Sequence, residues 1–448
     1  MAGGREKTGP VSRKVVLPVA VAASLGSLVD YYDFFLAGFV AGAIWPTLFF
    51  PSKVAAVAVA SSIAAYGVSY LTRPIGAFLF GNYGDRSGRK STLIWTLLTA
   101  GVAMVGIALV PPYASIGLLA PTLVVLFRLL FGLGIGGEWG GASSWVIEHA
   151  YDSKWRAFWA SWVQGGAPAG RLVAGLAFAY TSTLLPRPEL ESIGWRVLFV
   201  VGAIVLVVAI VMRYLLSESP LFNELRKERG VERFPASKVL KDSWGKVLKL
   251  ALAVNYNVSI STIAVLPFTI TLVEALGRQH HLTTLELYRL STFTSLAISL
   301  GALSDLIFQA VGGVVSSVIG RKSTLLVSIA LSVVAIYPYF LMVITLNPAL
   351  ILVASVLLQS AFGLGYGGVP AFLTESFQTK YRYSGSGLSY QLGSLISGVA
   401  GGFVVPAIVL LSPTVTTRWV YVGALAMILT VFSLVAVLMT TETKDVKL

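Results

Sequence analysis

Seven ionisable side chains interrupt long apolar stretches of this sequence, and these are the positions where chemistry is expected. They are four acids and three arginines, namely Asp30, Asp33, Arg73, Arg128, Glu138, Arg171 and Asp305. A charge inside a lipid bilayer is costly, so such residues are rare and generally functional. A carboxyl can carry a proton, and a guanidinium can bind a carboxylate or phosphate through two parallel hydrogen bonds. These residue types indicate the handling of protons and of a small anion inside a membrane.

The elements that carry these residues are predicted to be membrane-spanning helices. Of the 448 residues, 56% are hydrophobic and 12% are charged, whereas soluble domains contain about 25% charged residues. A helix of about 20 apolar residues spans a bilayer. Apolar segments lie at about 16–46, 55–80, 91–111, 119–148, 157–185, 195–216, 247–276, 291–319, 323–346, 349–376, 384–411 and 417–440. We therefore expect an all-α integral membrane protein with twelve transmembrane helices in two six-helix, pseudo-symmetric halves.

The distribution of charge predicts the domain order and the orientation. The polar stretch 217–249 reads as a solvated linker with amphipathic helical parts, between an N-terminal half (15–216) and a C-terminal half (250–440). Placing this linker and the two end segments, 1–14 and 441–448, on one face puts 24 basic residues there and six on the other. By the positive-inside rule that face is cytoplasmic. The net charge of +13 thus reflects orientation in the plasma membrane rather than a nucleic-acid partner.

Several classes of chemistry are excluded by composition. The chain has no cysteine and only three histidines, which removes thiolate nucleophiles, iron–sulfur clusters and Cys-type zinc sites. No nucleotide-binding P-loop occurs, because Gly245-Lys246 is followed by Val247, and neither H-E-x-x-H nor G-x-S-x-G is present. The chain is therefore expected not to be an enzyme and to need no cofactor or metal. Its expected partners are a small-molecule substrate, protons and the lipid bilayer, and it is expected to act as a monomer.

Two motifs are repeated in the same order in the two halves. G-R-K-S-T-L occurs at 88–93 and 320–325, and G-L-G-x-G-G occurs at 132–137 and 363–368. An acid followed by a loop arginine recurs as Glu148 with Arg156 and as Glu375 with Arg382. Ordered matches at nearly one offset indicate parallel repeats of six helices, which are typical of transporters.

The loop G-N-Y-G-D-R-S-G-R-K at 81–90 resembles the signature loop of the major facilitator superfamily. Asp85 can face the positive N-terminus of a neighbouring helix, and Arg89 can pair with Glu148. The residues expected to hold the cytoplasmic side closed are Asp85, Arg86, Arg89, Glu148, Arg321, Glu375 and Arg382. The second copy, at 313–322, has Ser317 where the family has an acid, so the C-terminal contact is expected to be weaker. The simpler alternative for this loop is a positive-inside connection between two helices.

Further segments are similar to the metabolite:proton symporter family, in the sugar-porter and organic-ion-transporter neighbourhood. They are G-S-L-V-D-Y-Y-D-F-F at 26–35, R-P-I-G at 73–76, R-L-L-F-G-L-G-I-G-G-E at 128–138 and S-E-S-P-L-F at 217–222. The resemblance implies a central cavity lined by spans 1, 2, 4, 5, 7, 8, 10 and 11 and opened to either side by rocking of the halves. It implies proton-coupled symport of a small organic anion or related metabolite. The alternative is a proton-independent uniporter or exchanger of a sugar, compatible solute or phosphate.

Proton coupling is assigned to Asp33, with Arg128 as its partner, because a nearby arginine and a low dielectric shift carboxyl protonation in opposite directions. The resemblance also places an acid at Asp30, three residues before Asp33, and Glu138 belongs to the G-G-E pattern. The alternative is a permanent ion pair that only fastens two spans.

Substrate binding is assigned to the two remaining arginines and to polar residues on the cavity spans: Arg171, Arg73, Asp305, Gln164, Tyr32, Tyr256 and Gln391. Each has an alternative in structural pairing. Arg73 could pair with Asp30 or Asp33, and Arg171 could pair with Glu138 or with Asp305, a contact that would cross the cavity. The uncharged residues could serve packing between helices.

Overall fold

The computed structural model describes residues 13–228, 230–265 and 268–448, and these form helices and connecting turns without a β-strand. Most of the predicted N-terminal segment, 1–14, lies outside the described residues. The helices of the first half are α1 (Arg13–Ala43), α2 (Trp45–Leu48), α3 (Ala55–Gly67), α4 (Ser69–Ser87), α5 (Arg89–Leu109), α6 (Tyr113–Ile116), α7 (Leu119–His149), α8 (Arg156–Leu184), α9 (Arg187–Glu189), the π-helix η1 (Leu190–Gly194) and α10 (Trp195–Leu215).

The linker and the second half are also helical. Their helices are α11 (Pro220–Lys227), α12 (Pro235–Ser259), η2 (Ile260–Val265), α13 (Phe268–Gln279), α14 (Thr284–Ile319), α15 (Arg321–Val343), α16 (Pro348–Tyr366), α17 (Val369–Glu375), η3 (Thr379–Tyr381), α18 (Arg382–Val399), η4 (Ala400–Val404), α19 (Val405–Leu411) and α20 (Val415–Leu438). The linker contains α11 and the first part of α12, whose helical geometry is interrupted at Ser243 (φ −136°).

Ten helical segments among the described residues are long and apolar enough to cross a membrane. The two expected spans outside this set are α3–α4 and α8. Their hydropathy is lowered by glycine, serine and tyrosine residues and by a buried arginine in each, Arg73 on α4 and Arg171 on α8. The helices therefore give the twelve-span, two-half architecture that the sequence predicts.

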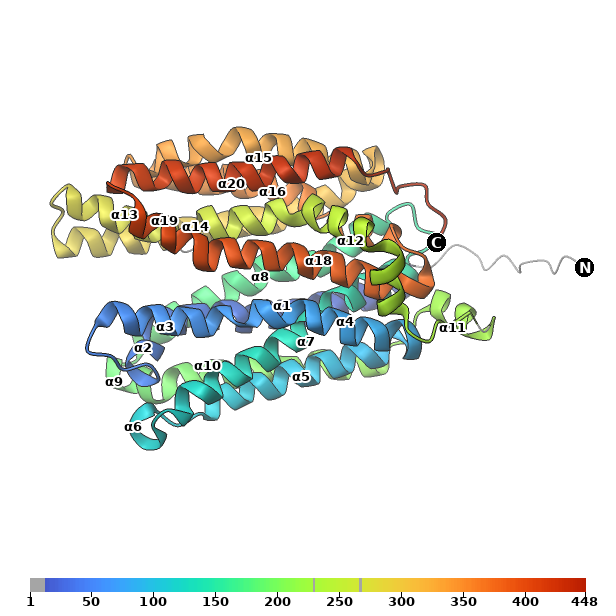
Figure 1. The fold of residues 1–448 in the computed structure, drawn as a ribbon, viewed down its shortest axis with the longest axis horizontal. Helices are drawn as coiled ribbons and strands as arrows, with labels where there is room; N and C mark the ends of the chain where they lie inside the picture. Colours follow the sequence, from blue (N-terminus) through green and yellow to red (C-terminus); the bar gives the residue numbers. More distant parts are fainter. Residues whose placement is uncertain (1–12, 229, 266–267) are drawn as a thin grey trace, which may run out of the picture.

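The two halves lie side by side with their helices running along a common axis (Figure 1). They meet where α8 packs against α14 and where α18 packs against α4 and α7. Glycines allow this close approach: a Cβ added to Gly140 on α7 would lie 2.7 Å from the Cα of Gly387 on α18. The interface is therefore a backbone-to-backbone contact that tolerates no larger side chain at Gly140.

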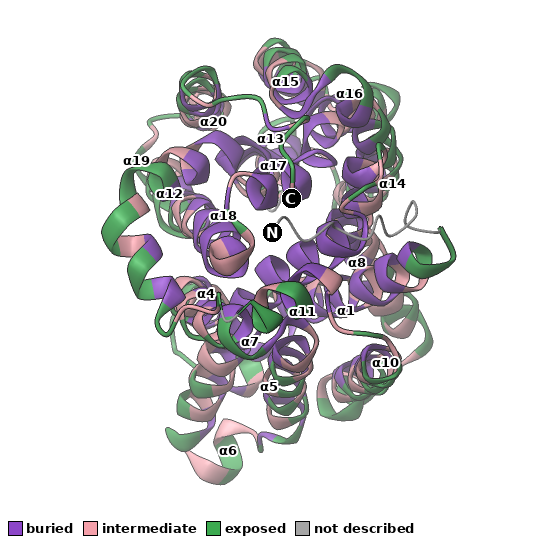
Figure 2. Cartoon of the chain, turned by 90° about the vertical axis from the view of Figure 1, so that its right-hand side faces the viewer, coloured by how far each residue is buried: buried purple, intermediate pink, exposed green. Residues whose placement is uncertain are grey.

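One end of the bundle carries the linker helix α11 and the C-terminus, and we call it the linker end; α2, α6, α9 and α13 lie at the opposite end (Figure 1). Viewed from the linker end, buried residues face the interior and exposed residues cover the perimeter (Figure 2). Many large exposed side chains are apolar, including Leu109, Leu118 and Leu215, each more than 70% exposed. An apolar perimeter suits a lipid environment.

Candidate functional site

A small cavity lies between the halves, near the middle of the helices. Its lining comes from α1, α4 and α8 of the first half and from α12, η2, α14, α16 and α18 of the second. It includes both Arg73 and Arg171, together with Asp305. The volume of about 50 Å³ has room for a few water molecules, whereas ligand pockets usually enclose about 300–1,000 Å³. The cavity is therefore contracted around its own polar groups.

Arg73 lies against two aromatic rings and forms no ion pair with a carboxylate among the described residues. Its guanidinium carbon lies 4.6 Å from the ring centre of Phe34 and 4.2 Å from that of Tyr70. The side chain is 3% exposed, and its Nε and Nη2 atoms have no hydrogen-bond partner among the described residues. Arg73 therefore forms no direct ion pair with Asp30 or Asp33, although its charge acts on Asp30 through space.

Arg171 reaches from α8 to the second half. Its Nη2 donates to the Oε1 of Gln359 on α16 at 2.5 Å, and its Nη1 donates to the Oγ of Ser261 at 3.2 Å. Its closest carboxylate oxygen is the Oδ2 of Asp305 on α14, 3.8 Å from Nη2. The predicted contact across the cavity between Arg171 and Asp305 is therefore present.

Asp33 and Arg128 form a fully buried ion pair within the first half. The Nη1 of Arg128 donates to the Oδ2 of Asp33 at 2.8 Å, and the guanidinium lies over the ring of Phe131 at 4.5 Å. Asp33 Oδ1 and two nitrogens of Arg128 lack partners in the described part of the chain. One turn earlier on α1, both carboxyl oxygens of Asp30 are buried and unpartnered there as well. The pair exists as predicted, beside a second carboxyl whose oxygens accept no hydrogen bond from the described residues.

Glu138 pairs with Arg213, a partner that the sequence analysis missed. Two nitrogens of Arg213, on α10, donate to the carboxylate of Glu138, and Thr96 donates to it at 2.8 Å. Arg213 is one of the 24 basic residues assigned from the sequence to the linker face, but its side chain is fully buried rather than exposed there. Its position inside the apolar run 195–216 was the signal that could have identified it. Pairing of Arg171 with Glu138 is likewise contradicted.

The other predicted substrate contacts do not line the cavity. The hydroxyl of Tyr32 donates to the carbonyl of Leu198, and that of Tyr256 lies 3.0 Å from Ser328 Oγ, so both are satisfied inside their own halves. Gln391 donates from Nε2 to the carbonyl of Ile135 at 3.3 Å, which links the halves. None of these three side chains is among the residues that line the cavity.

Gln164 belongs instead to an aromatic cluster between the cavity and the linker end. Trp139 Nε1 donates to Gln164 Oε1 at 2.8 Å, and the ring of Trp139 stacks on Tyr390 at 3.8 Å. The hydroxyl of Tyr390 is hydrogen bonded to those of Tyr31, at 2.9 Å, and Tyr366. Trp139 and Tyr31 come from the first half and Tyr366 and Tyr390 from the second, so this cluster joins the halves.

Two ion-pair clusters join the halves at the linker end. Glu148 accepts two hydrogen bonds from Arg89, both at 3.0 Å, and one from Arg382 of the other half at 3.1 Å. Glu375 accepts from Arg321 of its own half, at 2.7 and 2.9 Å, and from Arg156 of the first half at 2.8 Å. The loop arginine of each half thus binds the repeated acid of the other half.

Asp85 makes an additional contact that has no counterpart from Ser317 among the described residues. Its oxygens accept from the backbone N–H groups of Tyr383 and Ser384 at 3.1 and 2.8 Å, at the N-terminus of α18. Ser317 donates only to Gly313 in its own helix. Arg86 is exposed and forms no ion pair in the part of the chain that the structure describes, so it does not join the clusters.

Two further acids cap helices at the linker end. Glu218 accepts from the backbone N–H groups of Arg89 and Lys90 at 3.0 and 3.1 Å, and Glu442 accepts from those of Arg321 and Lys322 at 2.8 and 3.0 Å. Burial raises the pKa of Glu218 despite its hydrogen bonds. Burial also acts to raise the pKa of Glu442, but its backbone hydrogen bonds outweigh burial and hold that pKa below the usual value.

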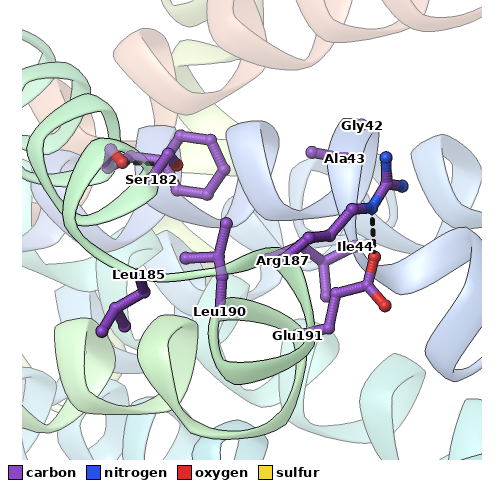
Figure 3. Close-up of a pocket in the computed structure, with 9 residues that line it drawn as sticks. Gly42, Ala43, Ile44, Ser182, Leu185, Arg187, Leu190 and Glu191 are labelled. Carbon is purple, nitrogen blue, oxygen red and sulfur yellow. Dashed lines mark hydrogen bonds and ion pairs between the residues drawn. The ribbon is translucent and has the colours of Figure 1, made fainter.

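A larger pocket of about 480 Å³ lies at the opposite end of the bundle, between the ends of α1 and α8 and the turn of α9 and η1 (Figure 3). Its charged groups, Arg187 and Glu191, form an ion pair at 2.7 Å in which Arg187 is 76% exposed. It contains none of the buried charges, so the central cavity remains the candidate site.

Comparisons with known proteins agree with this architecture. Residues 23–402 match the family model described as the Major Facilitator Superfamily. The chain is 32% identical to the inner membrane metabolite transport protein YhjE of Escherichia coli, over 86% of each chain. It is 32% identical to a citrate-proton symporter of Klebsiella pneumoniae, covering 84% of this chain and 81% of the relative.

Among solved structures, the chain resembles the proton:xylose symporter XylE bound to 6-bromo-6-deoxy-D-glucose, with a TM-score of 0.74 and 15% identity. The match covers 96% of this chain and 97% of that one. At this identity the likeness concerns the fold alone.

Proposed function

This chain belongs to the major facilitator superfamily, and on that premise we propose that it couples proton movement to the symport of a small organic anion by alternating access. The premise itself makes the chain a multi-pass membrane transporter and not an enzyme. The finer statements, namely the anion and the proton, are supported by the buried charges.

The main support for an anionic substrate is that two arginines line one cavity between the halves. Arg171 is held by two uncharged side chains and by a carboxylate at 3.8 Å. Arg73 has aromatic rings and no carboxylate partner among the described residues. A buried guanidinium is stabilised most by a bidentate carboxylate or phosphate. The citrate named for one relative is a carboxylate, which agrees with this preference.

The proton carrier in this proposal is Asp33. Breaking a buried ion pair exposes a lone carboxylate to a low dielectric, so separation from Arg128 favours protonation of the acid. Free hydrogen-bonding capacity on both partners means that their pairing is incomplete in this conformation. Asp30, three residues away and unpartnered within the described residues, is positioned to share the proton.

The linker end is proposed to be the cytoplasmic side, because the linker and the segments around it carry most of the basic residues. The ion-pair clusters and Asp85 would then close the cytoplasmic side in the conformation described here. Release of substrate into the cell would require Arg382 to leave Glu148 and Arg156 to leave Glu375.

The test is ligand binding followed by uptake. A panel of mono- and dicarboxylates, sugar acids, sugars, betaines and phosphate would be scored by thermal shift of the purified protein. The best ligand, in labelled form, would then be presented to proteoliposomes with and without an inward proton gradient. We expect carboxylates to bind and the gradient to drive accumulation above equilibrium.

Equilibration without accumulation in both conditions would instead identify a uniporter or exchanger. Binding confined to neutral sugars would contradict the anionic substrate. Empty liposomes, and proteoliposomes made with protein inactivated by heat, provide the controls for leakage.

A further inference from the structure

The two halves carry opposite charges at equivalent positions of the repeat. The G-R-K-S-T-L motifs begin at 88 and 320, an offset of 232 residues, and the same offset takes Arg73 on α4 to Asp305 on α14. Both side chains line the central cavity. Among the described residues, the first half thus presents to the cavity a cation without a directly bonded carboxylate, and the second half presents an anion.

Asp305 is held in the cavity by specific neighbours. Its Oδ1 accepts a hydrogen bond from Gln309 Nε2 at 2.7 Å, one turn along the same helix. Gly363, in the repeated glycine motif of α16, leaves space for it, because a Cβ there would lie 2.6 Å from Oδ1. Asp305 is 5% exposed. The carboxylate therefore has a defined site that faces Arg171 of the other half.

The contact between Asp305 and Arg171 is close enough for charge compensation and too long for a hydrogen bond. The Oδ2 to Nη2 distance is 3.8 Å, while the guanidinium makes its hydrogen bonds to Gln359 and Ser261. Arg171 Nε has no partner among the described residues. An incoming carboxylate that bonded this guanidinium directly would be held more tightly than Asp305 is.

We propose that Asp305 occupies the place of a substrate carboxylate when the site is empty, and that substrate and Asp305 compete for Arg171. When the substrate carboxylate binds Arg171, Asp305 takes up one proton and remains on Gln309 as the neutral acid. One anion and one proton enter together, so the charge of the site is unchanged. This inference rests on the proposed function, and it adds a second proton site at Asp305 to the one at Asp33.

Arg171 is the charged group that stabilises the ionised form of Asp305. Arg171 faces it from α8, Tyr256 from α12 and Tyr366 from α16, and both tyrosines interact with it electrostatically. A neutral tyrosine cannot replace a guanidinium as a counter-charge. When the substrate occupies Arg171, the charge of Asp305 is therefore neutralised by uptake of a proton.

The first experiment is chemical rescue of the full-length protein in detergent. Asp305→Ala removes the internal carboxylate and leaves space at Arg171 that formate can fill. The melting temperature is measured with sodium formate and with sodium chloride at equal ionic strength. We expect saturable stabilisation of Asp305→Ala by formate, at lower formate concentrations than in the matched variant Asp152→Ala, whose residue is exposed in a loop and in which Asp305 still competes for Arg171.

The second experiment uses Asp305→Asn and keeps the inference testable if the alanine variant does not fold. Formate stays anionic between mildly acidic and mildly alkaline pH. Its apparent affinity for the wild-type protein should weaken by about tenfold per pH unit toward the alkaline end, because binding takes up one proton. The affinity of Asp305→Asn should not change with pH.

Two results would overturn the inference: no formate-specific stabilisation of Asp305→Ala, or the same pH dependence in the wild type and in Asp305→Asn. Both measurements are made without a membrane gradient. Failure of gradient-driven uptake with a positive formate result would therefore reject the proposed function alone, and uptake without the formate effects would reject only the role of Asp305.

Discussion

The buried arginines fall into two kinds according to their distance from a carboxylate. Arg128 and Arg213 each donate directly to an acid of the same half, Asp33 and Glu138. Arg73 and Arg171, the two that line the cavity, have no directly bonded carboxylate among the described residues. A buried cation without a strong partner is destabilising unless a ligand supplies one. This difference in pairing, more than the presence of arginine, is the basis for placing the proposed anion at Arg73 and Arg171.

Replacing Arg73 by lysine tests the guanidinium at constant charge. We expect carboxylate affinity to fall by about 10- to 100-fold, because a charge-assisted hydrogen bond contributes about 1.5–3 kcal/mol and an ammonium loses the planar, bidentate geometry. Titration calorimetry with citrate, or with the best carboxylate of the panel, measures this. Equal affinity in the wild type and in Arg73→Lys would remove Arg73 from the site.

Asp33→Asn is expected to abolish accumulation against a gradient while binding and exchange persist. The amide keeps the size of the side chain but cannot carry the proton that couples transport. Counterflow of labelled substrate, measured beside gradient-driven uptake, separates the two activities. Asp152→Asn is the matched control, and gradient-driven accumulation that survives in Asp33→Asn would contradict the assignment.

At the level of helices, glycine contacts and capped ends hold the linker end closed. Gly140 on α7 and Gly387 on α18 bring two helices of different halves into backbone contact. Helices α5 and α15 each begin after a glycine with positive φ, Gly88 at 119° and Gly320 at 107°. The acids Glu218 and Glu442 then cap their first N–H groups. These elements fix where the arginines of the ion-pair clusters stand.

A single methyl group at Gly140 should shift the protein away from the closed linker end. The added Cβ would lie 2.7 Å from the Cα of Gly387, a distance that requires the halves to separate locally. Because the chain has no cysteine, one introduced on the cavity side can be labelled without background. We expect faster labelling from the linker side in Gly140→Ala than in Gly42→Ala, where the new Cβ has no neighbour within 4 Å. Equal rates would contradict this.

Glu442 should make docking of the C-terminal segment dependent on pH. Because the pKa of Glu442 is lowered in the folded state, its stabilising contribution is present above the ordinary glutamate pKa of about 4.3 and is lost as pH falls through the lowered value. We expect hydrogen exchange at the start of α15 to accelerate in that acidic range, and already at neutral pH in Glu442→Gln. The exposed Glu228→Gln serves as the control, and identical exchange in both variants would exclude the cap.

For the whole molecule, the ion pairs that Arg156 and Arg382 form with acids of the opposite half couple the two halves. Arg382 bonds Glu148 and Arg156 bonds Glu375, so each acid binds an arginine from both halves. Removing an acid leaves buried guanidiniums unpaired, which costs about 3–5 kcal/mol for a buried pair. The cost applies to the conformation in which the linker end is closed, and the open conformation exposes those arginines to water.

The double variant Glu148→Gln, Glu375→Gln should therefore favour opening at the linker end. Spin labels at Lys154 and Gln378 report on that end, and labels at Thr183 and His280 report on the opposite end; all four sites lie in loops or at helix ends. We expect the first distance to lengthen and the second to shorten relative to the labelled wild-type background. Unchanged distances at both ends would show that the clusters do not set the conformation.

Much of this arrangement could be predicted from sequence because the repeats and apolar runs are local patterns. The twelve spans, the Asp33–Arg128 pair, the Arg89–Glu148 pair and the contact of Arg171 with Asp305 were all expected. The exchange of Arg156 and Arg382, the partner of Glu138 and the caps by Glu218 and Glu442 were not. These depend on how helices distant in sequence lie against one another, which spacing along a single helix does not encode. Tyr32 and Tyr256 lie outside the cavity lining for the same reason, since the rotation of each helix decides which of its side chains reach the cavity.

Substrate-evoked proton movement tests the central claim most directly. Proteoliposomes containing the wild-type protein and an internal pH-sensitive dye, with no initial proton gradient, would receive the carboxylate that binds best. We predict immediate acidification of the lumen, saturable in substrate and absent in Asp33→Asn. Substrate entry, followed with labelled ligand in the same vesicles, without acidification would contradict proton-coupled symport and leave uniport or exchange.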